Sequence, residues 1–145
     1  RPMLDFNRYF LPESQIFLDN LQYEKLEKQN TTEKRKLNCK DTILAQHSDK
    51  WVKINFNRTL SFAPEGVFRL SVTFGVLMPL NPQTKDEINW KETDIAGAFR
   101  ESCKPLLTSL MSRTSLMVAQ ITSASGQNPL ITPASPVTDP AGNMQ

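Results

Sequence analysis

The stretch Pro105-Leu-Leu-Thr-Ser-Leu-Met-Ser-Arg-Thr-Ser-Leu-Met-Val-Ala-Gln-Ile-Thr-Ser-Ala-Ser-Gly-Gln-Asn-Pro-Leu-Ile-Thr-Pro133 decides the fold of this chain. Its first part carries apolar residues at helical spacing, and Gly126 follows as a candidate helix stop. The run Asn128–Pro133 is typical of extended backbone. No side chain in the stretch offers obvious chemistry, so its pattern indicates a role in burying surface.

The helical pattern extends back to Ile95, directly after Asp94 as a candidate N-cap, and forward to Ser123. Its apolar arc is about 160° wide, broader than the roughly 100° stripe of a helix that packs on one surface. Pro105 is expected to kink the helix or divide it in two. We therefore expect one side of the helix to cover a sheet and another to meet a second subunit. The candidate subunit-interface residues are Leu107, Leu110, Met111 and Val118.

Two stretches upstream alternate apolar and polar residues with period two, over residues 50–62 and 66–78. This period predicts strands that each bury one face. The turn residues Ala63-Pro-Glu-Gly66 separate them, which predicts an antiparallel hairpin.

The flanking segments give weaker patterns. Residues 14–28 predict a strand with a bulge near Asp19-Asn20, or a helix toward the end that is rich in Glu and Lys. Residues 29–49 are polar and predict a long loop, and residues 87–91 predict a short edge strand. The cluster Lys34–Lys36 favours a solvated loop over a phosphate-binding patch.

The composition indicates one domain over residues 1–135 and a loose C-terminal tail over 136–145. The net charge of +2 is too small to indicate nucleic-acid binding, and no apolar run is long enough to span a membrane. With no visible signal peptide, two separated cysteines fit a reducing cytoplasm, although one disulfide in a secreted protein is the alternative.

Catalytic chemistry is poorly represented. The sequence has one histidine and no phosphate-binding, serine-hydrolase or metal-ligating motif, so we expect no catalytic residues, no metal and no cofactor. The weakest of three functional hypotheses is a small enzyme that uses Cys39, Asp41 and His47. A chain with so little chemistry is better explained as a binding protein.

The order of these elements resembles the SecB-like superfamily of protein-export chaperones, including short Gram-positive members. Ile121-Thr-Ser-Ala-Ser-Gly126-Gln-Asn-Pro129-Leu-Ile-Thr-Pro133 is similar to their endings, and Cys103-Lys-Pro-Leu-Leu107 to their first helical turns. Leu18-Asp-Asn-Leu-Gln-Tyr-Glu-Lys25 resembles their first strand. The resemblance implies an α+β fold in which one long C-terminal helix packs on a four-stranded antiparallel sheet.

The same resemblance implies a homodimer or homotetramer that holds unfolded precursor polypeptides without ATP and passes them to the SecA motor. Apolar residues without a core assignment are the client-binding candidates: Trp51, Trp90 and Leu116. Export chaperones are strongly acidic and carry a second helix as a lid, whereas this chain has a net charge of +2 and a short tail. These differences support an alternative, a non-chaperone oligomeric module whose loop 29–49 recognises one protein partner.

Overall fold

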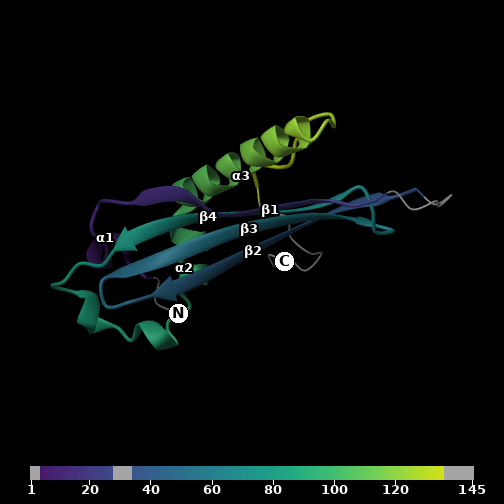
Figure 1. Cartoon of the computed structure of the whole chain (residues 1–145). Coiled ribbons are helices and arrows are strands. Elements are labelled where there is room, and N and C mark those ends of the chain that lie inside the picture. The colour runs from purple at the N-terminus through teal and green to yellow at the C-terminus, as the bar shows by residue number, and fades with distance from the viewer. Residues whose placement is uncertain (1–3, 28–33, 136–145) are drawn as a thin grey trace.

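The structure is a computed structural model that describes residues 4–27 and 34–135; the predicted tail over 136–145 lies outside the described residues. Its centre is a four-stranded antiparallel sheet in the order β1-β4-β3-β2. The strands are β1 (Gln15–Lys25), β2 (Lys36–His47), β3 (Trp51–Ala63) and β4 (Phe68–Pro79). The helices α2 (Ile95–Ser102) and α3 (Lys104–Ala124) cover one face of this sheet, which confirms the predicted α+β fold (Figure 1).

The predicted hairpin is confirmed, since β3 and β4 pair antiparallel around the turn that follows Ala63. Alternate residues of both strands face the helices and form most of the core. The buried members on this face are Val52, Ile54, Phe56, Arg58, Leu60, Phe68, Leu70, Val72, Phe74, Val76 and Met78.

The bulge predicted in the first strand is also confirmed. The pairing of β1 with β4 shifts register between Leu18 and Asn20. Because the extra residue reverses the alternation, Ile16 and Leu18 before it face the same way as Leu21 and Tyr23 after it. One side of β1 is therefore apolar along its whole length.

The predicted loop over residues 29–49 is wrong where Lys36–His47 forms β2 and pairs with β3 along its full length, while residues 29–33 of the predicted loop lie outside the described residues. The apolar alternation of Leu37, Cys39, Ile43 and Ala45 is interrupted by Asp41, which hides the pattern. Asp41 is nevertheless buried, because its register partner on β3 is Arg58. Because a charged residue stands at a core position, the sequence of this strand resembles that of a solvated loop.

The predicted edge strand over residues 87–91 is wrong as well. This segment forms two 3₁₀ turns, η1 (Lys85–Glu87) and η2 (Trp90–Glu92). The Asn89 side chain accepts a hydrogen bond from the Lys91 amide, which favours a turn over extended pairing. The edges of the described sheet are β1 and β2.

The predicted helix is divided as expected, because the backbone leaves helical geometry at Cys103 and α3 then starts with Pro105 in its first turn. The Asp94 carboxylate caps α2 by accepting from the Gly97 amide at 3.1 Å. At the other end Gly126 has a φ of 83°, and the Gly126 and Gln127 amides close a Schellman motif on Ser123 and Thr122.

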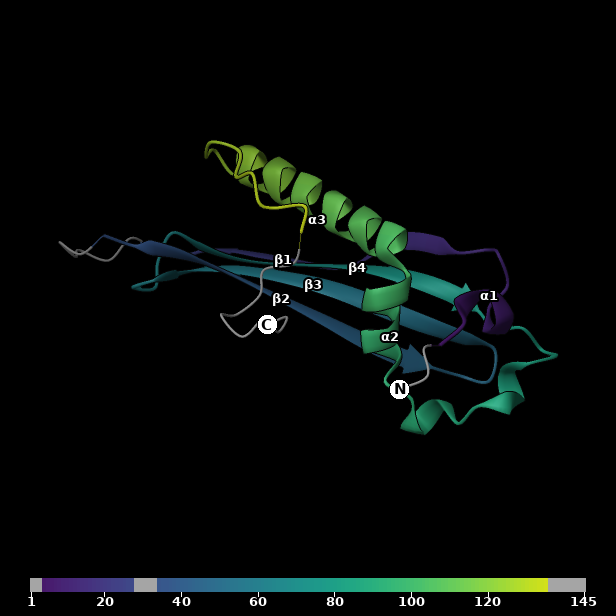
Figure 2. The same ribbon diagram turned by 180° about the vertical axis from the view of Figure 1, so that it is seen from behind.

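An N-terminal arm closes one end of the molecule. The short helix α1 (Phe6–Tyr9) is held against η1 by Arg8, whose guanidinium donates two hydrogen bonds to Glu87 at 2.9 and 2.7 Å. Figure 2 shows α1 and the segment between β4 and α2 at the same end of the sheet, and it shows α3 crossing above the sheet. The C-terminal segment then turns back from α3 toward the sheet.

Candidate polypeptide-binding surfaces

The three predicted client-binding residues lie apart. Leu116 is on the outer face of α3 and is 60% exposed. It lies nine residues after the buried Leu107, a spacing that puts the two side chains on opposite sides of the helix. Trp51 alternates with the buried Val52, so its half-buried side chain belongs to the sheet face away from the helices. The structure does not bring Leu116 and Trp51 into one groove.

Trp90 belongs to an aromatic cluster at the arm. Its ring packs edge-on against Tyr9 and Phe10, with centroids 6.0 and 5.6 Å apart, and its Nε1 donates to the Lys85 carbonyl at 2.8 Å. These contacts give Trp90 a structural role in holding the arm on the η1–η2 segment. A hollow of about 590 Å³ lies beside it, lined also by His47, Asp49 and Lys85.

The predicted subunit-interface residues Leu107, Leu110, Met111 and Val118 are all buried within one chain. At helical spacing these four side chains fall on one side of α3, and this side packs on the sheet. They are therefore not available to a second subunit. A subunit interface on α3 stays a prediction, and it has to use another face of the helix.

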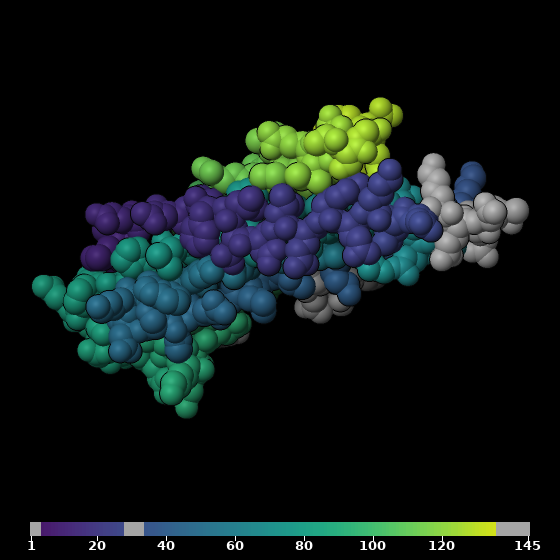
Figure 3. Space-filling model, in the orientation of Figure 1, coloured from purple at the N-terminus to yellow at the C-terminus, as the bar shows by residue number. Residues whose placement is uncertain are grey.

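An apolar surface that sequence reasoning did not identify runs between β1 and α3. α3 lies mainly over β4, so the apolar side of β1 next to it is covered only in part. Ile16, Leu21 and Tyr23 are half-buried there, and Leu18 is 41% exposed. In Figure 3 the β1 residues form a band directly below the α3 residues.

The facing side of α3 is apolar too. Leu106 and Met117 are eleven residues apart, so their side chains lie within about 20° of each other around the helix axis, and Ile121 follows one turn later. Leu106 lines a hollow together with Pro12 and Ser14, which lead into β1, so this side of α3 points toward β1. We call this surface the β1–α3 seam. It consists of Ile16, Leu18, Leu21, Tyr23, Leu106, Met117 and Ile121.

The seam has a hollow at each end. The hollow that Leu106 lines measures about 380 Å³ and lies beside the N-terminal arm. The other measures about 770 Å³ and lies between Leu26 at the end of β1, Val67 and the Gly126 turn after α3. Near this second end the Tyr23 hydroxyl is buried without a hydrogen-bond partner among the described residues.

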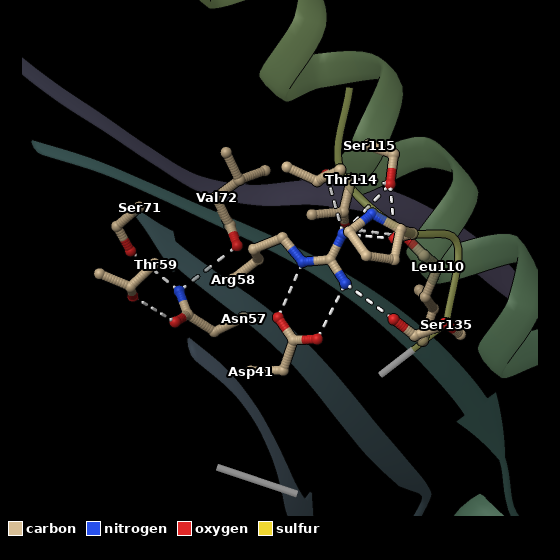
Figure 4. Close-up of polar contacts among 12 residues, drawn as sticks. Asp41, Asn57, Arg58, Thr59, Ser71, Val72, Leu110, Thr114, Ser115 and Ser135 are labelled. Atoms are coloured by element: carbon tan, nitrogen blue, oxygen red, sulfur yellow. Dashed lines mark hydrogen bonds and ion pairs between the residues drawn. The ribbon is translucent and has the colours of Figure 1, made fainter. Parts of the chain in front are cut away.

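The opposite side of α3 covers a buried ion pair (Figure 4). The Arg58 guanidinium donates two hydrogen bonds to the Asp41 carboxylate, Nε to Oδ1 and Nη2 to Oδ2, each 2.8 Å long. Both side chains are fully buried. Burial by itself would lower the pKa of Arg58, but hydrogen bonding and the charge of Asp41 raise it overall, so Arg58 stays protonated.

Arg58 also binds the segment that follows α3. Its Nη1 donates to the Pro133 carbonyl at 2.6 Å and to Thr132 Oγ1 at 2.9 Å, and its Nη2 donates to the Ser135 carbonyl at 3.1 Å. Ser115 of α3 donates to the Pro133 carbonyl at 3.0 Å. A charged residue at a buried position of an alternating strand is the sequence signal that could have indicated this cluster.

The residues of the enzyme hypothesis are not assembled. Asp41 is occupied by Arg58, and His47 lies six residues further along β2, about 20 Å away in a strand. Burial raises the pKa of Cys39, and it raises that of Cys103 to about 11, so neither thiol is activated as a nucleophile.

No group of three or more potential metal ligands occurs among the described residues, and no helix in the described part of the chain is long and apolar enough to cross a membrane.

Comparison with known proteins identifies a similar fold. The structure of the Mycobacterium tuberculosis Rv1957 SecB-like chaperone, in complex with a ChAD peptide from the Rv1956 HigA1 antitoxin, superimposes with a TM-score of 0.59. The match covers 83% of this chain and 89% of the Rv1957 chain at 12% sequence identity. No protein-family model and no curated protein sequence matches the chain. The chain therefore has the fold of a SecB-like chaperone.

Proposed function

We propose that this protein is an ATP-independent, SecB-like binder of extended, non-native polypeptide, and that the β1–α3 seam is its binding surface. The observation that carries the proposal is the partly exposed apolar surface shared by an edge strand and a helix, with a hollow at each end. Between Leu106 and Ile121 α3 rises about 22 Å, which matches about seven residues of extended chain.

The chemistry of the seam fits this ligand. Unfolded segments expose apolar side chains and unpaired main-chain groups, and the seam offers apolar side chains beside the unpaired edge of β1. The fold neighbour Rv1957 binds a peptide, which supports peptide binding by a protein of this shape. We extend the proposal to a cytoplasmic homodimer or homotetramer that protects export precursors, with SecA as a receiving partner.

The seam is tested by placing charge on it. Leu18→Glu and Met117→Glu should each lower the affinity for an unfolded client about tenfold or more, because they remove an apolar contact of roughly 1.5–3 kcal/mol. Binding is measured by fluorescence anisotropy with a reduced, carboxymethylated model protein, and function by suppression of its aggregation.

Leu44→Glu is the matched control. Leu44 is 66% exposed on β2 and belongs to the sheet face away from the helices, so the same charge there should leave client affinity unchanged. Equal losses in Leu18→Glu and Leu44→Glu, with both proteins folded, would sink the assignment of the seam. Binding by neither the parent protein nor any variant would remove the chaperone function itself.

A second candidate function is a non-chaperone module that recognises one protein partner. The observation that favours it is the peptide in the Rv1957 complex, which comes from a single named antitoxin. The seam could serve either function, so selectivity decides between them. A holdase binds several unrelated unfolded proteins with similar affinity, whereas a specific module binds one sequence and ignores the rest.

A further inference from the structure

The segment after α3 is held mainly through its main chain. Arg58 donates to the carbonyls of Pro133 and Ser135, two residues apart, which is the spacing at which an extended chain presents carbonyls to one side. Leu130 contributes its amide, which donates to Thr122 Oγ1 at 2.9 Å. Main-chain groups are common to all polypeptides, so most of these hydrogen bonds do not depend on the sequence of the segment.

The side chains of the segment are poorly buried. Ile131 is 82% exposed, and residues 133–135 are exposed as well. Only Thr132 is buried, and Leu130 is half-buried. The segment therefore gains little hydrophobic stabilisation where it lies, so another extended segment that makes the same main-chain hydrogen bonds can compete with it for the site.

The ion pair beneath the segment does not require it. Asp41 accepts two hydrogen bonds from Arg58 and neutralises its charge directly. Departure of residues 130–135 would leave Arg58 Nη1 beside Ser115, with its remaining donors open to water or to new carbonyls. No buried charge would be left unpaired, which is the condition that makes an emptied polar site tolerable.

We propose that the position beside α3 and above Arg58, which residues 130–135 fill, is a second polypeptide-binding site, and that these residues are its built-in, displaceable occupant. The ligand is the main chain of an extended peptide, read through alternate carbonyls by the Arg58 guanidinium. The proposal rests on the proposed function for the class of ligand, but it uses the opposite side of α3 from the seam. Release of the segment would enlarge the surface that a client contacts.

Because residues 130–135 are tethered to α3, a free peptide has to compete with a high local concentration of this segment. A short flexible tether gives an effective concentration of the order of millimolar. A free peptide with the sequence of residues 127–135, Gln-Asn-Pro-Leu-Ile-Thr-Pro-Ala-Ser, makes the same contacts. It should therefore displace half of the tethered segment at about 1–10 mM.

The test uses the full chain with Cys39→Ser and Cys103→Ala, so that Thr132→Cys introduces the only thiol. That thiol replaces a buried hydroxyl and should react slowly with a water-soluble disulfide reagent while the segment is in place. Millimolar peptide 127–135 should raise the reaction rate about fivefold or more. A peptide carrying Asp at the Leu130 and Thr132 positions is the control and should leave the rate unchanged.

A reversible lock gives an independent readout. The hydroxyl oxygens of Ser115 and Thr132 are 3.3 Å apart, so Ser115→Cys/Thr132→Cys places two sulfurs within reach of a disulfide. The oxidised protein should bind labelled peptide 127–135 at least tenfold more weakly than the same protein after reduction. Equal binding by the two forms, or a reaction rate at position 132 that ignores the peptide, would overturn the second site.

The two proposals fail separately. Met117→Glu should lower client affinity at the seam about tenfold or more and leave the peptide-dependent reactivity at position 132 intact, because Met117 and Ser115 belong to different sides of α3. If Met117→Glu lowers client affinity while peptide 127–135 binds the locked and the reduced form equally, the seam stands and the second site is overturned.

Discussion

At the scale of single residues, Asp41 and Arg58 form a fully buried ion pair within the core. Removing one partner leaves the other as an uncompensated buried charge. We expect Asp41→Leu and Arg58→Met each to lower the free energy of unfolding by about 3–5 kcal/mol. The measurement is urea denaturation followed by circular dichroism, and wild type is compared at the same pH.

The double variant Asp41→Leu/Arg58→Met decides whether this loss comes from broken pairing or from lost volume. An apolar replacement of both members of a buried pair is often nearly neutral, so the double variant should recover most of the stability that either single change loses. Thr132→Val, which removes the hydroxyl contacts to Arg58 and Ser115, separates the contribution of the C-terminal segment. Additive losses in the double variant would contradict a coupled pair.

The same two residues explain where sequence reasoning stopped. The Asp41 position breaks the apolar alternation of β2, and Arg58 breaks that of β3, so each strand taken alone shows a polar interruption. Only the register that places them opposite each other makes both burials reasonable. Because β3 carries five apolar residues on its inner face and β2 only four, the interruption hid β2 and left β3 recognisable.

At the scale of elements, local signals were sufficient where they act within a few residues. The Asp94 cap, the break before Pro105 and the Gly126 stop each depend on neighbouring backbone, and each is confirmed. The turns over residues 85–92 combine the local Asn89 hydrogen bond with contacts to α1, which is distant in sequence. The seam was not predicted because it depends on how far α3 extends over β1, which only the packed structure fixes.

Gly126, which ends α3, gives a prediction at the scale of elements. Gly126 has a φ of 83°, and a Cβ built there would meet no atom within 4 Å. Gly126→Ala should therefore lower the free energy of unfolding by roughly 1–2 kcal/mol through backbone strain alone. Gly126→Asn should lose less, since Asn tolerates this conformation better, and urea denaturation of the two variants checks the order. Equal losses would point to a steric cause.

At the scale of the whole molecule, the structure limits which faces are available for assembly. The sheet-facing side of α3 is used within the chain, one flank carries the C-terminal segment and the other borders the seam. The outer face, with Leu116 at 60% exposure, remains for a helix-to-helix contact between subunits. A client at the seam and a partner on this outer face would not compete for the same side chains.

Assembly is tested by mass. We expect light scattering coupled to size exclusion to give a multiple of the 16.5 kDa chain mass, and Leu116→Asp to reduce it, because the substitution places a charge in the proposed helix contact. Leu44→Asp, on the sheet face away from the helices, should leave the mass unchanged. A monomer in the parent protein would exclude the oligomer. An oligomer that survives Leu116→Asp would exclude the outer face of α3 and leave the edges of β1 and β2 and the open sheet face as contacts. Of these, a contact at the edge of β1 would make assembly compete with client binding for the seam.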